Sequence, residues 1–290
     1  MVTSDHKKHG FEPLHDAHAI EQVVFAVQFH NPLDDAAFKD VCDELGPVTD
    51  DLPKKVPVGG PNLAGSNLIG QNITFTFGGA TSSIPSIPFG MIYQNVERDG
   101  TIGIEFRVDR ISIVFHTTLY TRWAATRTRA RKYFDVVLPK YVAKSRLAGI
   151  SLNYVDKFVW NGTPADCRPS LLLGANSKFL CPHVYDSPDL WHSHTGAFTR
   201  VDEYTKRLLN VNVDYIDEQR SGAPSRTIAI STVLSDLMNQ PEFTPLEIKE
   251  TEAISFFDLR MQQLHDYGKT VFANIINDSM SKRIALKAES

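Results

Sequence analysis

One thiol and three imidazoles stand close together in the sequence between residues 181 and 194. Cys181-Pro-His183 is followed, after a short gap, by Trp191-His-Ser-His194. On a strand, the two imidazoles of a His-x-His pair point to the same face, and Cys181 or Asp189 could add a zinc ligand. The motif therefore allows a metal-dependent enzyme that uses Cys181, His183, His192 and His194. The favoured alternative is a polar loop that enters a strand, because no paired Cys-x-x-Cys spacing is present.

The pair His265-Asp266 near the end of the chain is the best single candidate for acid–base chemistry. The sequence contains no Gly-x-Ser-x-Gly, His-Glu-x-x-His or Walker motif, which are typical of hydrolases and nucleotide-binding enzymes. His265 follows the apolar Leu264 on a predicted helix, which favours a structural histidine at a helix–sheet boundary. We therefore expect no cofactor, and we favour a protein without enzymatic activity.

A polar row on a predicted strand is a candidate binding surface. Asn210, Asn212 and Asp214 alternate with apolar residues between 208 and 216. Polar side chains on a covered face of a sheet need hydrogen-bond partners, so this row indicates a ligand or a protein partner. The predicted ligand-binding residues are Asn210, Asn212, Asp214, His265 and Asp266.

A basic stripe around residues 122–132 suggests nucleic acid or a phosphorylated ligand. Its cations are Arg122, Arg127, Arg129, Arg131 and Lys132. The net charge of −4 and the pI of about 6.2 oppose a dedicated nucleic-acid or anionic-membrane binder, which normally carries a basic excess. A solvated helix face is the favoured interpretation, and nucleic acid is kept as an alternative partner.

The composition is that of a soluble globular protein. The 290 residues are 42% hydrophobic and 22% charged, which is enough to build a sizeable core. No apolar run approaches the roughly 20 residues that span a bilayer, and the first residues lack the apolar core of a signal peptide. Cys42, Cys167 and Cys181 are too few and too scattered for a disulfide framework. The sequence predicts a cytoplasmic protein with reduced thiols.

Apolar periodicity predicts the elements that position these residues. A period of two predicts strands, and a period near 3.6 predicts helices. The predicted strands cover residues 21–30, 73–77, 92–96, 102–106, 111–120, 149–160, 197–201, 208–216 and 227–234. The predicted helices cover residues 35–45, 123–144 and 252–277, with a kink or a break at Pro139 and a short helical segment within 170–180.

The order of these elements repeats along the chain. After a flexible arm at residues 1–18, residues 19–148 run strand, helix, strands and long helix, and residues 149–290 follow the same plan. We predict an α+β fold of two similar halves, each an antiparallel sheet covered by helices, with a long helix at the C-terminus. An internal duplication is inferred from element order alone.

Three segments also resemble a known family. Asp109-Arg-Ile-Ser-Ile-Val-Phe115, Tyr120-Thr-Arg-Trp123 and Gly149–Phe158 are similar to the central signature of a sporadically distributed family of uncharacterised bacterial and archaeal proteins, named only by a serial number. Ala19–Phe29 resembles its opening strand, and Leu264-His-Asp266 resembles its closing helix. Where the family has Arg-Tyr-Ile-Asn, this chain has Asn153-Tyr154-Val155-Asp156.

The resemblance implies no reaction. The patchy distribution of the family resembles that of mobile defence genes. We therefore expect a bacterial binding, sensor or scaffold protein, associated with a phage-defence or other mobile accessory locus. Another protein is the expected partner. A homo-oligomer is left open, and no membrane partner is expected.

Overall fold

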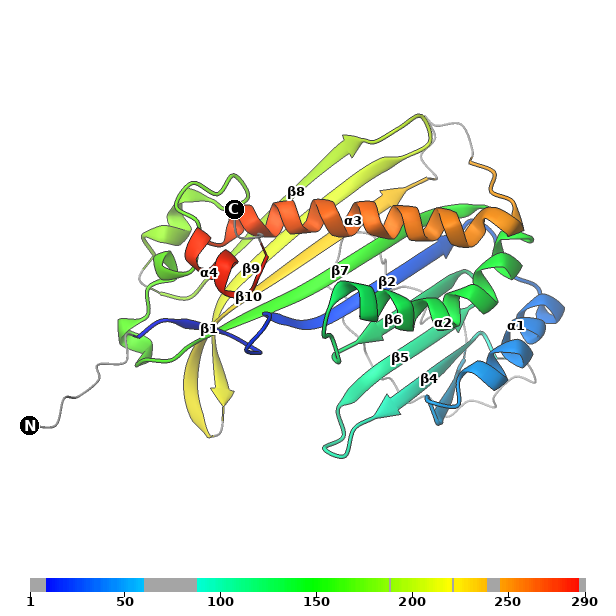
Figure 1. Cartoon of the computed structure of the whole chain (residues 1–290), viewed down its shortest axis with the longest axis horizontal. Helices are drawn as coiled ribbons and strands as arrows, with labels where there is room; N and C mark the ends of the chain where they lie inside the picture. Colours follow the sequence, from blue (N-terminus) through cyan, green and yellow to red (C-terminus); the bar gives the residue numbers. More distant parts are fainter. Residues whose placement is uncertain (1–8, 60–87, 188, 221, 239–245, 287–290) are drawn as a thin grey trace, which may run out of the picture.

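A single antiparallel sheet carries the fold, and all described strands belong to it (Figure 1). The structure is a computed structural model that describes residues 9–59, 88–187, 189–220, 222–238 and 246–286. Within these residues ten strands lie in the order β3-β4-β5-β6-β2-β7-β10-β9-β8, and β1 pairs with β7 beside β2. The strands are β1 (Phe11–Pro13), β2 (Ile20–Phe29), β3 (Lys54–Val58), β4 (Gly90–Val96), β5 (Ile102–Asp109), β6 (Ser112–Thr117), β7 (Leu147–Trp160), β8 (Trp191–Arg200), β9 (Lys206–Arg220) and β10 (Ala223–Leu237).

The centre of the sheet is the antiparallel pair of β2 and β7. Val23 lies opposite Tyr154, Phe25 opposite Leu152, and all four side chains are buried. Because successive side chains on a strand alternate between faces, the other residues of both strands point to the opposite side. The apolar residues of one face therefore form one continuous core across the sheet.

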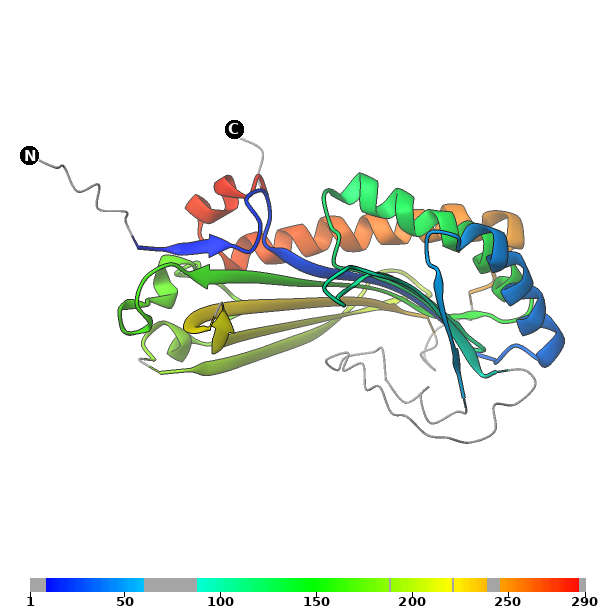
Figure 2. The same ribbon diagram turned by 90° about the horizontal axis from the view of Figure 1, so that it is seen from below.

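The described helices lie on one face of this sheet, as Figure 2 shows. The helices are α1 (Asp35–Val48), α2 (Trp123–Val142), α3 (Ala253–Ile275) and α4 (Asp278–Arg283), with 3₁₀ turns η2 (Pro164–Asp166), η3 (Pro169–Leu171), η4 (Pro182–Tyr185) and η5 (Glu250–Glu252). Phe134 of α2 stacks on Phe257 of α3, with ring centroids 4.4 Å apart. The other face carries no helix in the described part of the chain, and we call it the helix-free face. None of the described helices is long and apolar enough to cross a membrane.

The predicted α+β class, the antiparallel pairing and the long C-terminal helix are confirmed. The strands form one sheet, joined at the β2–β7 pair. Helix α2 continues past Pro139 to Val142, so the proline does not break it there. The missing N–H of Pro139 falls near the C-terminal end of the helix, where few further turns depend on it.

Several boundaries differ from those predicted. Phe11–Pro13, within the predicted flexible arm, pairs with β7 as β1. Lys54–Val58 forms the edge strand β3 although Pro57 lies within it, because a proline is tolerated on a sheet edge. Strand β8 begins six residues before the predicted 197. The predicted strand at 73–77 lies outside the described residues.

Replacing Phe257 by Ala should lower the free energy of unfolding by about 3–5 kcal/mol, because it opens a cavity where α2 and α3 meet. Leu259 on the same helix is 57% exposed, so Leu259→Ala should change the free energy by less than about 0.5 kcal/mol. Urea unfolding followed by circular dichroism measures both. Equal effects of the two substitutions would contradict the proposed contact.

Candidate functional site

A cluster of polar and aromatic side chains lies beneath α3 on the helix-covered face. The hydroxyl of Tyr154 in β7 lies 2.9 Å from Nδ1 of His265 in α3. Four residues along β7, Phe158 stacks on Phe272 of the same helix with centroids 6.2 Å apart. Strand alternation places Asp156 on this face between these two contacts. The carboxyl group of Asp156 therefore lies under α3, inside the sheet–helix interface.

Asp156 is buried without compensation. Asp156 is 4% exposed, and the residues opposite it on the neighbouring strands are Ile20 and Ile230. Within the described residues its carboxyl group has no hydrogen-bond or ion-pair partner, and burial raises its pKa to about 8. The protonated, neutral form therefore dominates at pH 7.

His265 is held as a neutral ring by its surroundings. Its ring stacks on Trp123 at 4.1 Å with an interplanar angle of 6°. Burial lowers its pKa to about 4, and the nearby Asp266 only partly opposes this effect. Asp266 itself is exposed and accepts a hydrogen bond from Nε2 of Gln262 at 3.0 Å. The two predicted acid–base residues thus bind different neighbours, which agrees with a structural role for His265.

The segments that carry the family resemblance converge on this cluster. Tyr120, Trp123, Tyr154, Asp156 and His265 come from three distant parts of the chain. Tyr120 packs edge-on against Tyr154 at 6.5 Å, and burial raises the pKa of Tyr120 to about 12. Sequence reasoning missed Asp156. The signal was available, because the alternation of residues 149–160 places a carboxyl group on the apolar face between Tyr154 and Phe158.

A second polar group lies on the helix-free face, on strands β8 and β9. In this pairing His192 is opposite Asp214, and His194 is opposite Asn212. Nδ1 of His192 lies 2.9 Å from Oδ1 of Asp214, whereas Oδ1 of Asn212 is enclosed and has no hydrogen-bond partner among the described residues. Asn210 follows on the same face. We call His192, His194, Asn210, Asn212 and Asp214 the β8–β9 patch.

The structure regroups the residues that the sequence assigned to separate sites. The predicted metal residues His192 and His194 join the predicted ligand residues of β9, while His265 and Asp266 lie on α3, on the other side of the sheet. Cys181 is exposed at the start of η4, which also contains His183. Among the residues that the structure describes, no group of three or more His, Cys, Asp or Glu could hold a metal ion. The described geometry therefore gives the metal-site prediction no support.

The predicted basic stripe of α2 is largely engaged in contacts within the protein. Arg129 is exposed to solvent. Each of the other four cations binds a group within the chain: Arg122 donates to the carbonyl of Ala17, Arg127 donates to Gln262, Arg131 pairs with Asp135 and Asp258, and Lys132 pairs with Asp51. Ion pairs with three aspartates neutralise much of the stripe. This arrangement favours the solvated, structural interpretation over a phosphate-binding surface.

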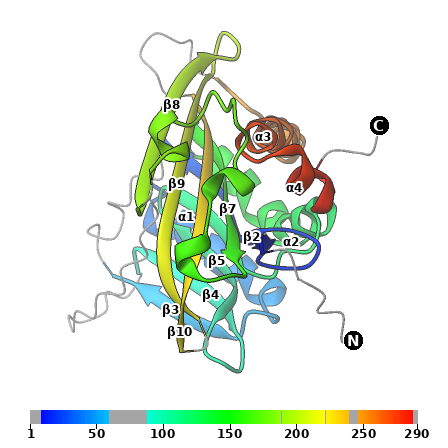
Figure 3. The same cartoon turned by 90° about the vertical axis from the view of Figure 1, so that its left-hand side faces the viewer.

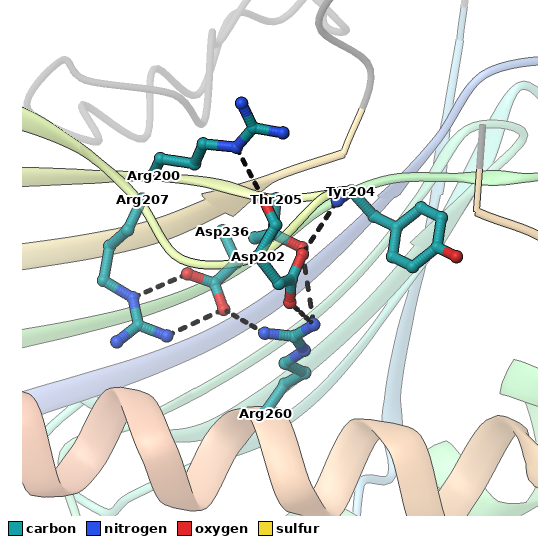
Figure 4. Close-up of polar contacts among 7 residues, drawn as sticks. All are labelled: Arg200, Asp202, Tyr204, Thr205, Arg207, Asp236 and Arg260. Atoms are coloured by element: carbon teal, nitrogen blue, oxygen red, sulfur yellow. Dashed lines mark hydrogen bonds and ion pairs between the residues drawn. The ribbon is translucent and has the colours of Figure 1, made fainter. Parts of the chain in front are cut away.

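A buried ion-pair network fixes the other end of α3 to the sheet (Figure 4). Arg207 of β9 donates two hydrogen bonds, of 2.6 and 2.9 Å, to the fully buried Asp236 of β10. Arg260 of α3 lies 3.7 Å from Asp236 and donates to Asp202 at 2.5 Å. Burial alone would raise the pKa of Asp202. Hydrogen bonds from Arg260, from the backbone N–H of Tyr204 and from the Thr205 side chain outweigh burial and lower the pKa. Two arginines and two aspartates balance, so the network leaves no net charge for a ligand.

Comparisons with known proteins do not assign the chain to a family. No family model and no curated protein matches this sequence. The family resemblance therefore stays a prediction, and the function has to be inferred from the geometry described above.

Replacing Asp156 by Asn should stabilise the protein increasingly as the pH rises. The pKa of this carboxyl is about 8 in the folded protein and near 4 when unfolded, so between these values the folded state binds more protons and wild-type stability falls with rising pH. Asparagine removes that loss. The difference between Asp156→Asn and wild type should grow by up to about 1.4 kcal/mol per pH unit from pH 5 to 8.

Urea unfolding at several pH values measures this difference. The matched control is Asp16→Asn, since Asp16 is exposed and its variant should follow the wild-type pH profile. A constant difference between Asp156→Asn and wild type over this range would show that Asp156 ionises freely in the folded protein.

Replacing Asp236 by Ala should destabilise the protein by about 3–5 kcal/mol, because Arg207 loses its buried partner. A geometrically similar pair on the same two strands is the control. Arg226 contacts Asp217 at 2.6 Å, but the Asp217 side chain is 44% exposed. Asp217→Ala should therefore cost no more than about 1 kcal/mol. Comparable losses in thermal or urea unfolding would argue against a special role for burial.

Proposed function

We propose that this chain is a non-enzymatic binding protein that recognises another protein through the β8–β9 patch. The observation that carries this proposal is the row of polar side chains on β8 and β9, with His192 and His194 exposed, on a face that no described helix covers. Polar side chains on an uncovered face are free to exchange hydrogen bonds with a bound partner.

The surroundings of Asn212 have the chemistry of a protein interface. His192, His194 and Asp214 offer donors and acceptors, and Phe198 on the same face of β8 is 59% exposed. The ammonium of Lys206 lies 5.4 Å from the centroid of the Phe198 ring. Aromatic side chains surrounded by hydrogen-bonding groups are typical of the residues that dominate binding energy.

The cluster under α3 supports a binding function less well. Tyr154 and His265 bond each other, and Trp123 is stacked between Phe25 and His265. Nε1 of Trp123 also donates to Gln262 at 2.7 Å. Because these three side chains are already engaged and α3 covers the neutral Asp156, we assign the cluster to docking of α3.

We also infer that the two predicted halves descend from a duplication. In the first half, β2 pairs with β6, the last strand before the long helix α2. In the second half, β7 pairs with β10, the last strand before α3. The two series lie on opposite sides of the β2–β7 pair in matching order, which supports a common plan. The family resemblance supports a bacterial protein from a defence or accessory locus, and the few, scattered cysteines support a cytoplasmic location.

Affinity capture with a patch variant tests the proposed function. His192→Ala, Asn212→Ala and Asp214→Ala are combined in one chain and compared with wild type, after cross-linking in the native cells with and without phage infection. We expect a partner protein that the patch variant loses at least tenfold, because three side chains of the interface are gone. Calorimetry with the purified partner then measures the affinity directly.

The control variant combines Lys39→Ala and Asp43→Ala, which removes an exposed ion pair on α1. It should retain the partner. Equal binding of this partner by wild type and patch variant would refute the assignment of the surface, and a nuclease-sensitive complex would favour the nucleic-acid alternative.

A further inference from the structure

The two edge strands of the sheet differ in their protection against further pairing. β3 is five residues long and carries Lys54, Lys55 and Pro57, which are features that block the addition of another strand. β8 is ten residues long, pairs with β9 in an unbroken register, and contains no lysine and no proline. Figure 3 shows β8 at the outer edge of the sheet. No strand of the described chain pairs with its outer side.

The C-terminal half of β8 is uncovered on both faces. All residues from 196 to 200 are exposed, although strand alternation directs them to opposite sides. Three of the seven large apolar side chains that are exposed in the described residues lie on or beside β8, namely Leu190, Phe198 and Val201. An open, regular and partly apolar edge is a template for pairing with another strand.

We propose that two copies of this chain pair through β8, antiparallel about a two-fold axis perpendicular to the sheet. A second copy is the occupant that the charges of β8 favour. When Gly196 lies opposite Gly196 of the other copy, Arg200 faces His192, which is hydrogen-bonded to Asp214. Arg200 lies opposite Lys206 of β9, so these two residues form a basic pair. Each end of the interface therefore brings this basic pair next to the pair His192–Asp214, which carries the negative charge of the aspartate.

The same register also suits the side chains near the axis. Thr195, Gly196 and Ala197 are small, so the two backbones can approach to the distance of paired strands. Phe198 then lies opposite His194 of the other copy, on the same face of the joined sheet. This contact covers the most exposed large apolar side chain of the described residues.

The dimer changes the geometry of the helix-free face. A two-fold axis perpendicular to the sheet keeps both helix-free faces on the same side, so the two β8–β9 patches become neighbours. The dimer would therefore present a bivalent surface. The dimer shares His192, His194 and Phe198 with the surface proposed for the partner, but dimerisation can be measured on the purified chain alone, so the two proposals can fail separately.

Sedimentation velocity over a concentration series tests the proposal, in reducing buffer because Cys181 is exposed. The wild-type chain should sediment as a dimer. Gly196→Lys should raise the dissociation constant at least tenfold, because two ammonium groups would meet at the axis. The control is Leu259→Lys, which introduces the same charge at an exposed site on α3 and should leave the dimer intact.

A second variant protects the test against misfolding, because a side chain at position 196 would displace the amide of Asn210. Arg200→Glu changes an exposed side chain, whose Nε donates to the carbonyl of Asp202 at 3.2 Å, without adding a side chain near Asn210. It should also weaken the dimer, while the double variant Arg200→Glu, Asp214→Arg should restore it. A wild-type chain that stays monomeric at about 100 µM, a concentration at which a dimer with a dissociation constant of about 1 µM would be largely assembled, would overturn the proposal. So would dimers that neither Gly196→Lys nor Arg200→Glu weakens while circular dichroism stays native.

Discussion

The register of β7 against its neighbours is the constraint on which the rest of the structure depends. This strand of fourteen residues pairs with β1 and β2 on one side and with β10 on the other. A slip of one residue would turn Leu152, Tyr154 and Phe158 away from the helices and place Asn153 and Lys157 in the core. The cost of burying a charged amine excludes that alternative, so the alternation of β7 fixes the faces of the whole sheet.

Helix α3 is docked on this fixed face by three different kinds of contact. Phe272 stacks on Phe158, His265 bonds Tyr154, and Arg260 joins the buried carboxylate of Asp236. Between these contacts Gly268 lets the helix approach closely, since a Cβ there would lie 3.2 Å from Leu234. The close approach leaves Asp156 without a polar partner, and the group responds by staying protonated.

The sequence determines the faces of the elements better than their partners. Alternation along residues 149–160 and 208–216 predicted both strands and the sides of their residues, because a period of two is a local property. The pairs Tyr154–His265 and Arg207–Asp236 could not be predicted, since they join residues far apart in the chain or on neighbouring strands of unknown register. Short strands such as β1 and β3 were missed because three to five residues carry too little periodicity.

The two faces of the sheet differ in how their polar side chains are covered, and this difference supports the proposed binding surface. On the helix-covered face α3 closes over the polar side chains, among them the bonded pair Tyr154–His265 and the neutral Asp156. On the helix-free face the polar row of β8 and β9 has no described helix above it and lies near the exposed Phe198. Side chains that α3 covers are out of reach of another molecule, whereas this polar row lies beside a strand edge with which no described strand pairs. The contrast between the two faces supports our proposal that another protein binds at β8 and β9.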